Sequence, residues 1–200
     1  MKPYIVITGC GSSGTGFTAK ALNKAGVQAK HERAGRDAIV SWYLGAKDVR
    51  LPSPKASGWS KVPTPYVLLH QTRHPLKVIS TVQAFRPESW DYMGRCLPGV
   101  FTPDLSLIQR CMRYWYHWNL LVEQQRPSLR YQVERLPELW DMVCDVIERP
   151  GLPNTAQDLS KTTHSRAGTY KALTWRDLRR ADAIFTHEVR KLGKRYGYGD

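Results

Sequence analysis

Residues 4–16 of the chain read Tyr-Ile-Val-Ile-Thr-Gly-Cys-Gly-Ser-Ser-Gly-Thr-Gly (YIVITGCGSSGTG). The stretch opens with a mostly apolar, β-branched run typical of a buried strand, and glycines and serines follow it directly. A strand that turns sharply into a helix through such a loop directs backbone N–H groups and the helix N-terminus at an anion. The stretch therefore predicts an anion-binding turn between a first strand and a first helix, and it leaves open which anion is bound.

The composition indicates one folded domain that spans residues 1–200. A chain of 200 residues, 42% of them hydrophobic, can bury a sizeable core and is too short for two comfortable domains. No apolar run approaches the ~20 residues that a membrane span needs, and the first residues lack the long apolar segment of a signal peptide. We therefore expect a cytoplasmic protein without a transmembrane segment.

The net charge and the cysteine spacing restrict the kinds of ligand that we expect, but they do not identify one. The 30 lysines and arginines outnumber the 17 acidic residues, and the resulting formal net charge of +13 favours anionic ligands. The basic residues are scattered through the chain instead of being gathered in one tail. The four cysteines stand far apart with no CxxC pair, so free thiols are the simplest expectation. We expect no bound metal and no nucleic-acid partner.

Signals for strands and helices alternate along the chain. Strands are expected at residues 4–8, 27–33, 66–71 and 128–134, and helices at residues 18–25, 75–85, 137–148, from about 104 onward and from 174 onward. Loops are expected at residues 45–65, 86–103 and 152–173. Such alternation predicts an α/β domain with a mainly parallel sheet, covered by helices in a three-layer α/β/α arrangement.

Three of the early glycines match a second known pattern. Gly9, Gly11 and Gly14 fit the G-x-G-x-x-G fingerprint of dinucleotide-binding proteins, and Glu32, about twenty residues further on, would then bind the ribose hydroxyl. Because this fingerprint is degenerate, a NAD-binding oxidoreductase stays as the third interpretation of the loop.

Two further interpretations of the loop lack residues that they need. A P-loop NTPase has the Gly9-x4-Gly14 spacing, but Thr15 stands where its phosphate-binding lysine belongs and Gly16 where its magnesium ligand belongs. A thiol phosphatase with Cys10 as nucleophile would need an arginine where Gly16 stands. What remains is a P-loop-shaped cradle without a metal site. Such a cradle suits a sulfuryl donor, whose reacting end carries less charge than a triphosphate.

At this point the sequence resembles the sulfotransferases that use 3′-phosphoadenosine 5′-phosphosulfate (PAPS). Their 5′-phosphosulfate loop, a basic residue followed by Ser/Gly-Gly-Thr, corresponds to residues 12–15. Their 3′-phosphate element, an arginine after the third strand and a serine about eight residues later, corresponds to Arg73 with Thr81, or with Ser80 one position early. The late segment 165–175 (SRAGTYKALTW) resembles a basic loop that folds over the nucleotide, and residues 130–136 (RYQVERL) resemble a strand of the family in which Glu134 is a structural hydrogen-bond partner.

The resemblance implies a P-loop-like sulfotransferase fold that binds PAPS without a metal and transfers its sulfuryl group to a hydroxyl or amine. The implied acceptor is a small molecule or a glycan, and the basic composition is compatible with an acidic one. The nucleotide-binding residues that it implies are Gly11, Ser12, Ser13, Gly14, Thr15, Gly16, Phe17, Arg73, Ser80, Thr81 and Arg166.

The catalytic base implied by the resemblance lies just after the second strand. Glu32 occupies that place, and His31 beside it resembles the base of other branches of the family. The main departure is Ser12, because relatives carry a lysine or arginine there. Another cation would have to replace it, and the open candidates are Lys20, Arg33, Lys47, Lys55, Lys61 and Lys171. The same departure keeps a second interpretation open, a nucleotide-binding protein without transfer activity.

Overall fold

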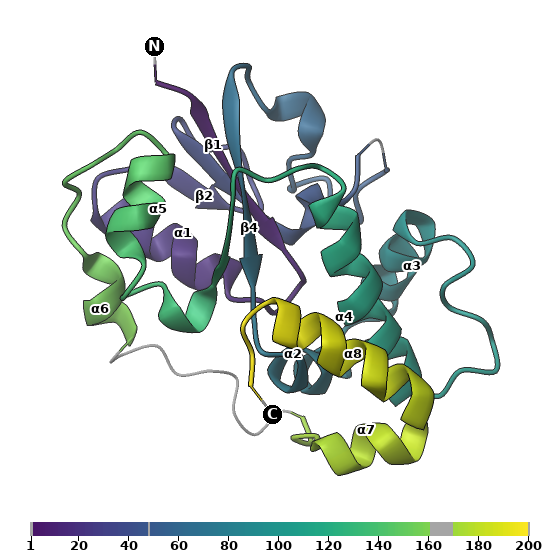
Figure 1. Ribbon diagram of the computed structural model, residues 1–200. Coiled ribbons are helices and arrows are strands. Elements are labelled where there is room, and N and C mark those ends of the chain that lie inside the picture. Colours follow the sequence, from purple (N-terminus) through teal and green to yellow (C-terminus); the bar gives the residue numbers. More distant parts are fainter. Residues whose placement is uncertain (1, 48, 161–169, 200) are drawn as a thin grey trace.

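A computed structural model of the protein describes residues 2–47, 49–160 and 170–199. Its centre is a parallel sheet of five strands in the order β2-β3-β1-β4-β5 (Figure 1). The strands are β1 (Tyr4–Gly9), β2 (Ala29–His31), β3 (Ala38–Val40), β4 (Tyr66–Thr72) and β5 (Leu129–Gln132). The predicted α/β class and the mainly parallel sheet are confirmed.

Helices cover both faces of this sheet. They are α1 (Thr15–Lys24), α2 (Pro75–Val82), α3 (Pro87–Cys96), α4 (Leu107–Glu123), α5 (Trp140–Val146), α6 (Thr155–Ser160), α7 (Trp175–Ala181) and α8 (Ala183–Arg195), with short 3₁₀ turns at Trp42–Gly45, Trp59–Lys61 and Val133–Arg135. Helices α1, α5 and α6 share a core with one face, and α2, α3, α4, α7 and α8 share a core on the other side. None of the helices in the described ranges is long and apolar enough to cross a membrane.

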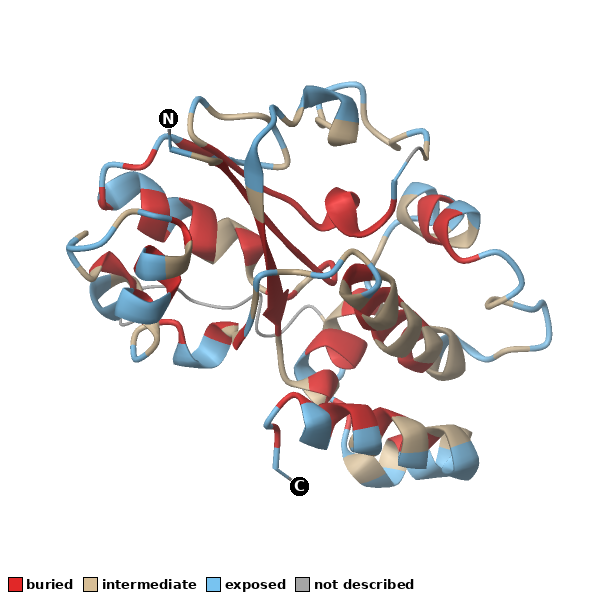
Figure 2. Ribbon diagram, turned by 45° about the horizontal axis from the view of Figure 1, so that its top comes forward, coloured by how far each residue is buried: buried red, intermediate tan, exposed pale blue. Residues whose placement is uncertain are grey.

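The central strands are buried on both faces, as parallel strands between two helical layers must be. Ile5 and Ile7 of β1 pack with Leu22 of α1, whereas Tyr4 and Val6 point to the other face. Figure 2 shows the strands as a buried band, with exposed residues on the outer sides of the helices. This burial explains why the opening apolar run is continuous instead of alternating with polar residues.

Four elements differ from the sequence-based expectations. The expected loops at 86–103 and 152–173 contain α3 and α6, the expected last helix is divided into α7 and α8, and residues 38–40 form the extra strand β3. Helix α3 forms because Tyr92 and Met93 are completely buried in the core, which outweighs its glycine and its polar residues. The division of the last helix occurs at Asp182, whose side chain accepts a hydrogen bond from the Phe185 N–H and caps α8.

Strand β3 also bears on the dinucleotide-binding interpretation. It pairs with β1 on one side and with β2 on the other, so the second strand in the sequence is not the neighbour of the first. In the dinucleotide-binding fold the strand order is 3-2-1-4-5-6, with the second strand directly beside the first. The observed order therefore does not match that fold, although the glycine spacing does.

A completely buried histidine lies in the central strand β4. The Nε2 atom of His70 lies 3.0 Å from Oδ1 of Asn119, whose amide nitrogen donates to the carbonyl of Trp115. Nε2 therefore carries the proton, and Nδ1 has no hydrogen-bond partner within the described ranges. Burial lowers the pKa of His70 to about 3, so the ring stays neutral in the folded protein well below neutral pH.

We expect His70 to make the protein sensitive to mild acid. Between pH 7 and pH 5 the unfolded chain protonates this histidine and the folded chain does not, which lowers the free energy of unfolding by about 2 kcal/mol. His70→Gln keeps a donor for Asn119 and does not titrate, so its loss over the same range should be smaller by that amount. Urea denaturation at both pH values measures the difference, and equal losses would contradict the assignment.

Candidate functional site

The turn between β1 and α1 is tightly folded. Ser12 and Gly14 have positive φ angles of 69° and 91°. A Cβ atom on Gly14 would lie 3.0 Å from a methyl group of Val133, so the turn needs glycine there for conformation and for space. The Ser13 N–H donates to the carbonyl of Cys10 at 3.0 Å, and the Gly11 N–H donates to the Tyr114 hydroxyl at 2.6 Å. These two amides are therefore bonded within the protein.

A buried glutamine at the end of β4 holds this turn in place. The Gln71 side-chain nitrogen donates to the carbonyl of Ser13 at 2.7 Å, and its oxygen accepts from the hydroxyls of Thr18 and Tyr131. Gln71 is completely buried, and its backbone oxygen lies only 2.0 Å from the point that a Cβ on Gly9 would occupy. Sequence reasoning missed Gln71, although a polar residue at the end of a buried strand is a usable signal.

The first turn of α1 has open hydrogen-bond donors. Its N-cap residue Gly14 makes no side-chain cap, and no acidic residue lies in the first turn. The backbone N–H groups of Thr15, Gly16 and Phe17 have no partners inside the helix, as is usual for a first turn. Such uncapped donors, together with the helix dipole, form a binding site for an oxyanion. This is the place predicted from residues 11–17.

The two serines of the loop differ in their surroundings. Ser13 is almost completely buried, and its hydroxyl lies 3.0 Å from the Cβ position of Gly9, without a hydrogen-bond partner in the described part of the chain. Ser12 contributes its carbonyl oxygen, which faces the end of β4. The backbone N–H groups of the first turn of α1 are therefore the donors of this loop that are best defined for a ligand.

Arg73 joins the two elements that the sequence analysis paired. One nitrogen of its guanidinium, Nη1, donates to the carbonyl of Ser12 at 2.8 Å across a separation of 61 residues. Helix α1 leaves β1 toward one face of the sheet, and α2 leaves the adjacent β4 toward the other face. Ligands of open parallel sheets bind in the crevice that forms where neighbouring connections diverge in this way. Arg73 lies directly against the turn, at the end of the sheet where these connections diverge.

The two candidate hydroxyls in α2 differ in their surroundings. The Ser80 hydroxyl donates to the Leu76 carbonyl at 2.6 Å and accepts from the Leu173 N–H at 2.8 Å, and the residue is only 3% exposed. The Thr81 hydroxyl donates to the Lys77 carbonyl at 2.7 Å and is partly exposed, so its lone pairs can still be reached. Arg166, which the resemblance also implies at the nucleotide, lies outside the described residues.

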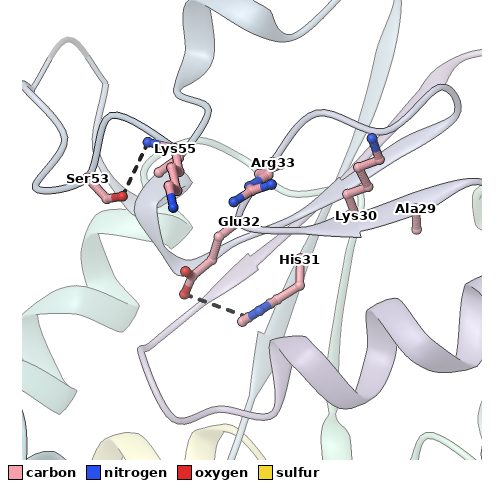
Figure 3. A pocket seen from close by; sticks show the side chains of 8 residues that line it. Ala29, Lys30, His31, Glu32, Arg33, Ser53 and Lys55 are labelled. Carbon is pink, nitrogen blue, oxygen red and sulfur yellow. Dashed lines mark hydrogen bonds and ion pairs between the residues drawn. The ribbon is translucent and has the colours of Figure 1, made fainter.

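Both candidate bases lie at the end of β2, beside the turn. Nε2 of His31 lies 3.0 Å from the Thr15 hydroxyl and 3.7 Å from a carboxylate oxygen of Glu32 (Figure 3). Burial lowers the pKa of His31, the Glu32 charge opposes that shift and Lys20 adds to it. His31 is therefore mostly neutral at pH 7, and it connects the loop to the carboxylate.

A cavity of about 530 Å³ opens next to Glu32. Its lining consists of Ala29, Lys30, His31, Glu32, Arg33, Ser53, Lys55 and Ala56, from the end of β2 and the loop that precedes the second 3₁₀ turn. Figure 3 shows the Glu32 and His31 side chains directed toward each other at one side of this space. The volume lies within the usual range for small-molecule sites.

Two other sequence-based expectations concern residues beside the site. The Cys10 thiol is buried, donates to the Trp115 carbonyl at 3.8 Å and has a pKa well above its usual range because of burial, so it is not a nucleophilic thiolate. Glu134 accepts from the His74 N–H at 3.0 Å and from the Tyr198 hydroxyl at 3.2 Å. It is a structural hydrogen-bond partner, as expected. Within the described ranges, no cluster of three or more His, Cys, Asp or Glu residues could hold a metal ion.

Comparison with solved structures finds a crystal structure of the mouse sulfotransferase SULT7A1 complexed with PAP. The match has a TM-score of 0.54 and covers 98% of this chain and 88% of the mouse chain. This chain has the sulfotransferase fold. The sequences are 10% identical, so the similarity is one of fold. No protein-family model matches the sequence, and no curated protein matches it either.

Proposed function

We propose that the protein is a sulfotransferase that moves a sulfuryl group from PAPS to a hydroxyl or amine. The observation that carries this proposal is the bond from Arg73 to the Ser12 carbonyl, because it sets a cation beside the open N-terminus of α1. A guanidinium and a helix N-terminus thus lie side by side, and the proposal assigns one phosphate of the nucleotide to each. The fold in which they lie is shared with an enzyme crystallised with PAP, the product that PAPS leaves after transfer.

In this proposal the nucleotide-binding roles divide between the two anchors. The first-turn amides of α1 and the Thr15 hydroxyl bind the 5′-phosphosulfate, and the tight turn of residues 11–14 gives the helix N-terminus its direction. Arg73 and Thr81 bind the 3′-phosphate, because both hydrogen-bonding functions of the Ser80 hydroxyl are already used inside the protein. PAPS supplies the sulfuryl group and the leaving phosphate.

The chemistry requires a base at the acceptor and positive potential at the leaving phosphate. Glu32 takes the proton from the acceptor hydroxyl, whose oxygen then forms its bond to sulfur as the bond from sulfur to the phosphate oxygen breaks. The first-turn amides receive the charge that develops on that oxygen. His31 is neutral and hydrogen-bonded to the Thr15 hydroxyl, and its role in this proposal is to hold that hydroxyl and the Glu32 carboxylate in position.

Binding of PAP tests the Arg73 anchor. Isothermal calorimetry should show PAP binding that is equal with magnesium and with a chelator, since the anchors are amides and a guanidinium. Arg73→Gln keeps a donor for the Ser12 carbonyl and removes the charge, and should weaken PAP by about tenfold to a hundredfold. Wild-type affinity in this variant, or a preference for NAD or ATP over PAP, would refute the proposed site.

Substitution of the two hydroxyl-bearing residues of α2, Ser80 and Thr81, gives a matched pair of variants. Thr81→Val removes a partly exposed hydroxyl at nearly constant volume, and we expect it to weaken PAP several-fold with little change in stability. Ser80→Ala removes two internal hydrogen bonds, which should lower the free energy of unfolding by about 1–3 kcal/mol and leave PAP affinity near that of the wild type. Calorimetry and urea denaturation of both variants decide, and the reverse pattern would assign the 3′-phosphate to Ser80.

Substitution at the end of β2 separates the base from its neighbour. Glu32→Gln should bind PAP normally and release PAP from PAPS at least about a hundredfold more slowly in the presence of acceptor, because a general base typically contributes 10²–10⁴. His31→Gln keeps a hydrogen-bonding group for Thr15 and should lose much less. If the two effects are exchanged, His31 is the base.

A nucleotide-binding protein without transfer activity is the second candidate, and Ser12 is the observation that favours it. This position carries a cation in the sulfotransferases that the sequence resembles. Normal PAP binding, with no PAP release from PAPS by the wild type over a broad set of acceptors, would support this candidate.

A further inference from the structure

The cavity beside Glu32 has walls that are fixed to one another. The Glu32 carbonyl accepts from the Ser57 N–H at 2.9 Å, and the Ser57 hydroxyl accepts from the Ala34 N–H at 3.0 Å. The loop wall is further shaped by the Ser53 hydroxyl, which accepts from the Lys55 N–H at 3.3 Å. Two segments about twenty residues apart in the sequence are thus held together as facing walls. These hydrogen bonds fix the shape of the cavity.

The charges that line this cavity are unequal. Lys30, Arg33 and Lys55 contribute three cations, and Glu32 contributes the one carboxylate. The Glu32 carboxylate lies 3.7 Å from the mostly neutral His31 ring, and none of the ion pairs among the described residues involves the three cations. Figure 3 shows Arg33 and Lys55 on neighbouring walls near Glu32, with Lys30 further along β2. A carboxylate that must act as a base is thus surrounded by an excess of positive charge.

We propose that this cavity binds the acceptor and that the acceptor is a small hydroxylated molecule with a negatively charged group, namely a carboxylate, a sulfate or a phosphate. The assignment as acceptor site rests on the proposed function, while binding of such an anion does not. The three cations hold the charged group, and a hydroxyl of the same molecule meets Glu32. A neutral polyol of the same size would leave the cations without partners and would bind less well.

The exposure of the three cations sets the size of the effect that each of them has on anion binding. Lys30, Arg33 and Lys55 are all exposed to solvent, so each contributes as a partly screened charge. Loss of one such cation should weaken the anion by about fivefold. Glu32 repels the same anion, so its removal should act in the opposite direction.

Ligand-observed and protein-observed NMR titrations test the proposal with four probes that share one ring: glucose, glucuronate, glucose 6-sulfate and glucose 6-phosphate. They are run on the full chain without nucleotide and again with saturating PAP, which keeps the anions away from the N-terminus of α1. We expect at least one of the three anions to bind at least about tenfold more tightly than glucose, and its advantage should fall as salt is raised from low to physiological ionic strength. The three anions show which charged group fits best.

Arg33→Gln and Lys55→Gln should each weaken the preferred anion by about fivefold and leave glucose unchanged. Lys61→Gln is the matched control, because Lys61 is an exposed lysine of the same connecting segment that does not line the cavity, and its loss changes the net charge equally. Glu32→Gln should tighten the anion. The proposal is overturned if glucose binds as well as the anions, if no probe binds, or if Lys61→Gln acts like Lys55→Gln.

Measurement of PAP release from PAPS provides a second test of the proposed acceptor site. Among these probes, and in a wider set of hydroxylated compounds, those that stimulate PAP release from PAPS should carry a negative charge, and Arg33→Gln or Lys55→Gln should raise their KM with kcat within about twofold. Stimulation only by neutral compounds would overturn the proposal. Failure of PAP to bind would instead count against the proposed function, and the titrations without nucleotide would still decide on the cavity.

Discussion

The site depends on one buried amide side chain. Gln71 lies where β4 ends, and its three hydrogen bonds reach the turn after β1, the helix α1 and the strand β5. A buried amide that lost any of these partners would leave an unsatisfied polar group, which costs more than the bond itself contributes. The turn is therefore held in a single arrangement relative to the sheet. The start of α1 is thereby fixed as well, because the bound carbonyl of Ser13 lies two residues before the helix.

Ser12 is fixed in the same arrangement. Ser12 has a left-handed backbone conformation, and its carbonyl accepts from Arg73. The guanidinium thus lies against the turn, although it comes from a different strand. Such a contact, between residues 61 positions apart, is invisible to a comparison of loop sequences. It does not replace the missing loop cation, because Arg73 is the proposed partner of the 3′-phosphate.

The sequence allowed the local parts of the structure to be predicted and not the parts that depend on distant contacts. The opening strand, its turn and the strand that ends before Arg73 each carry their signal in a few adjacent residues, and all three are present. Strand β3 has only three residues, too few for a period to be visible, and it forms because β1 and β2 pair with it on either side. Helix α3 likewise depends on burial of Tyr92 and Met93 against residues far along the chain.

The candidate site shows the same division. Glu32 and His31 were proposed as bases from their place at the end of the second strand, but the sequence does not show what each of them contacts. His31 contacts the Thr15 hydroxyl and has a pKa lowered by burial, so it is a neutral hydrogen-bonding partner of the turn. The distinction between Ser80 and Thr81 is similar, because Ser80 is occupied by a partner that lies 93 residues away.

The positive charges near the candidate site come from several elements instead of one sequence motif. Arg73 comes from the end of β4 and Lys20 from α1, while Lys30, Arg33 and Lys55 surround the cavity. Arg73 is partly exposed and the other four are exposed, so each contributes as a screened charge. The basic residues that give the chain its net charge of +13 are scattered in the sequence, and it is the fold that brings cations from separate segments to the ends of β2 and β4.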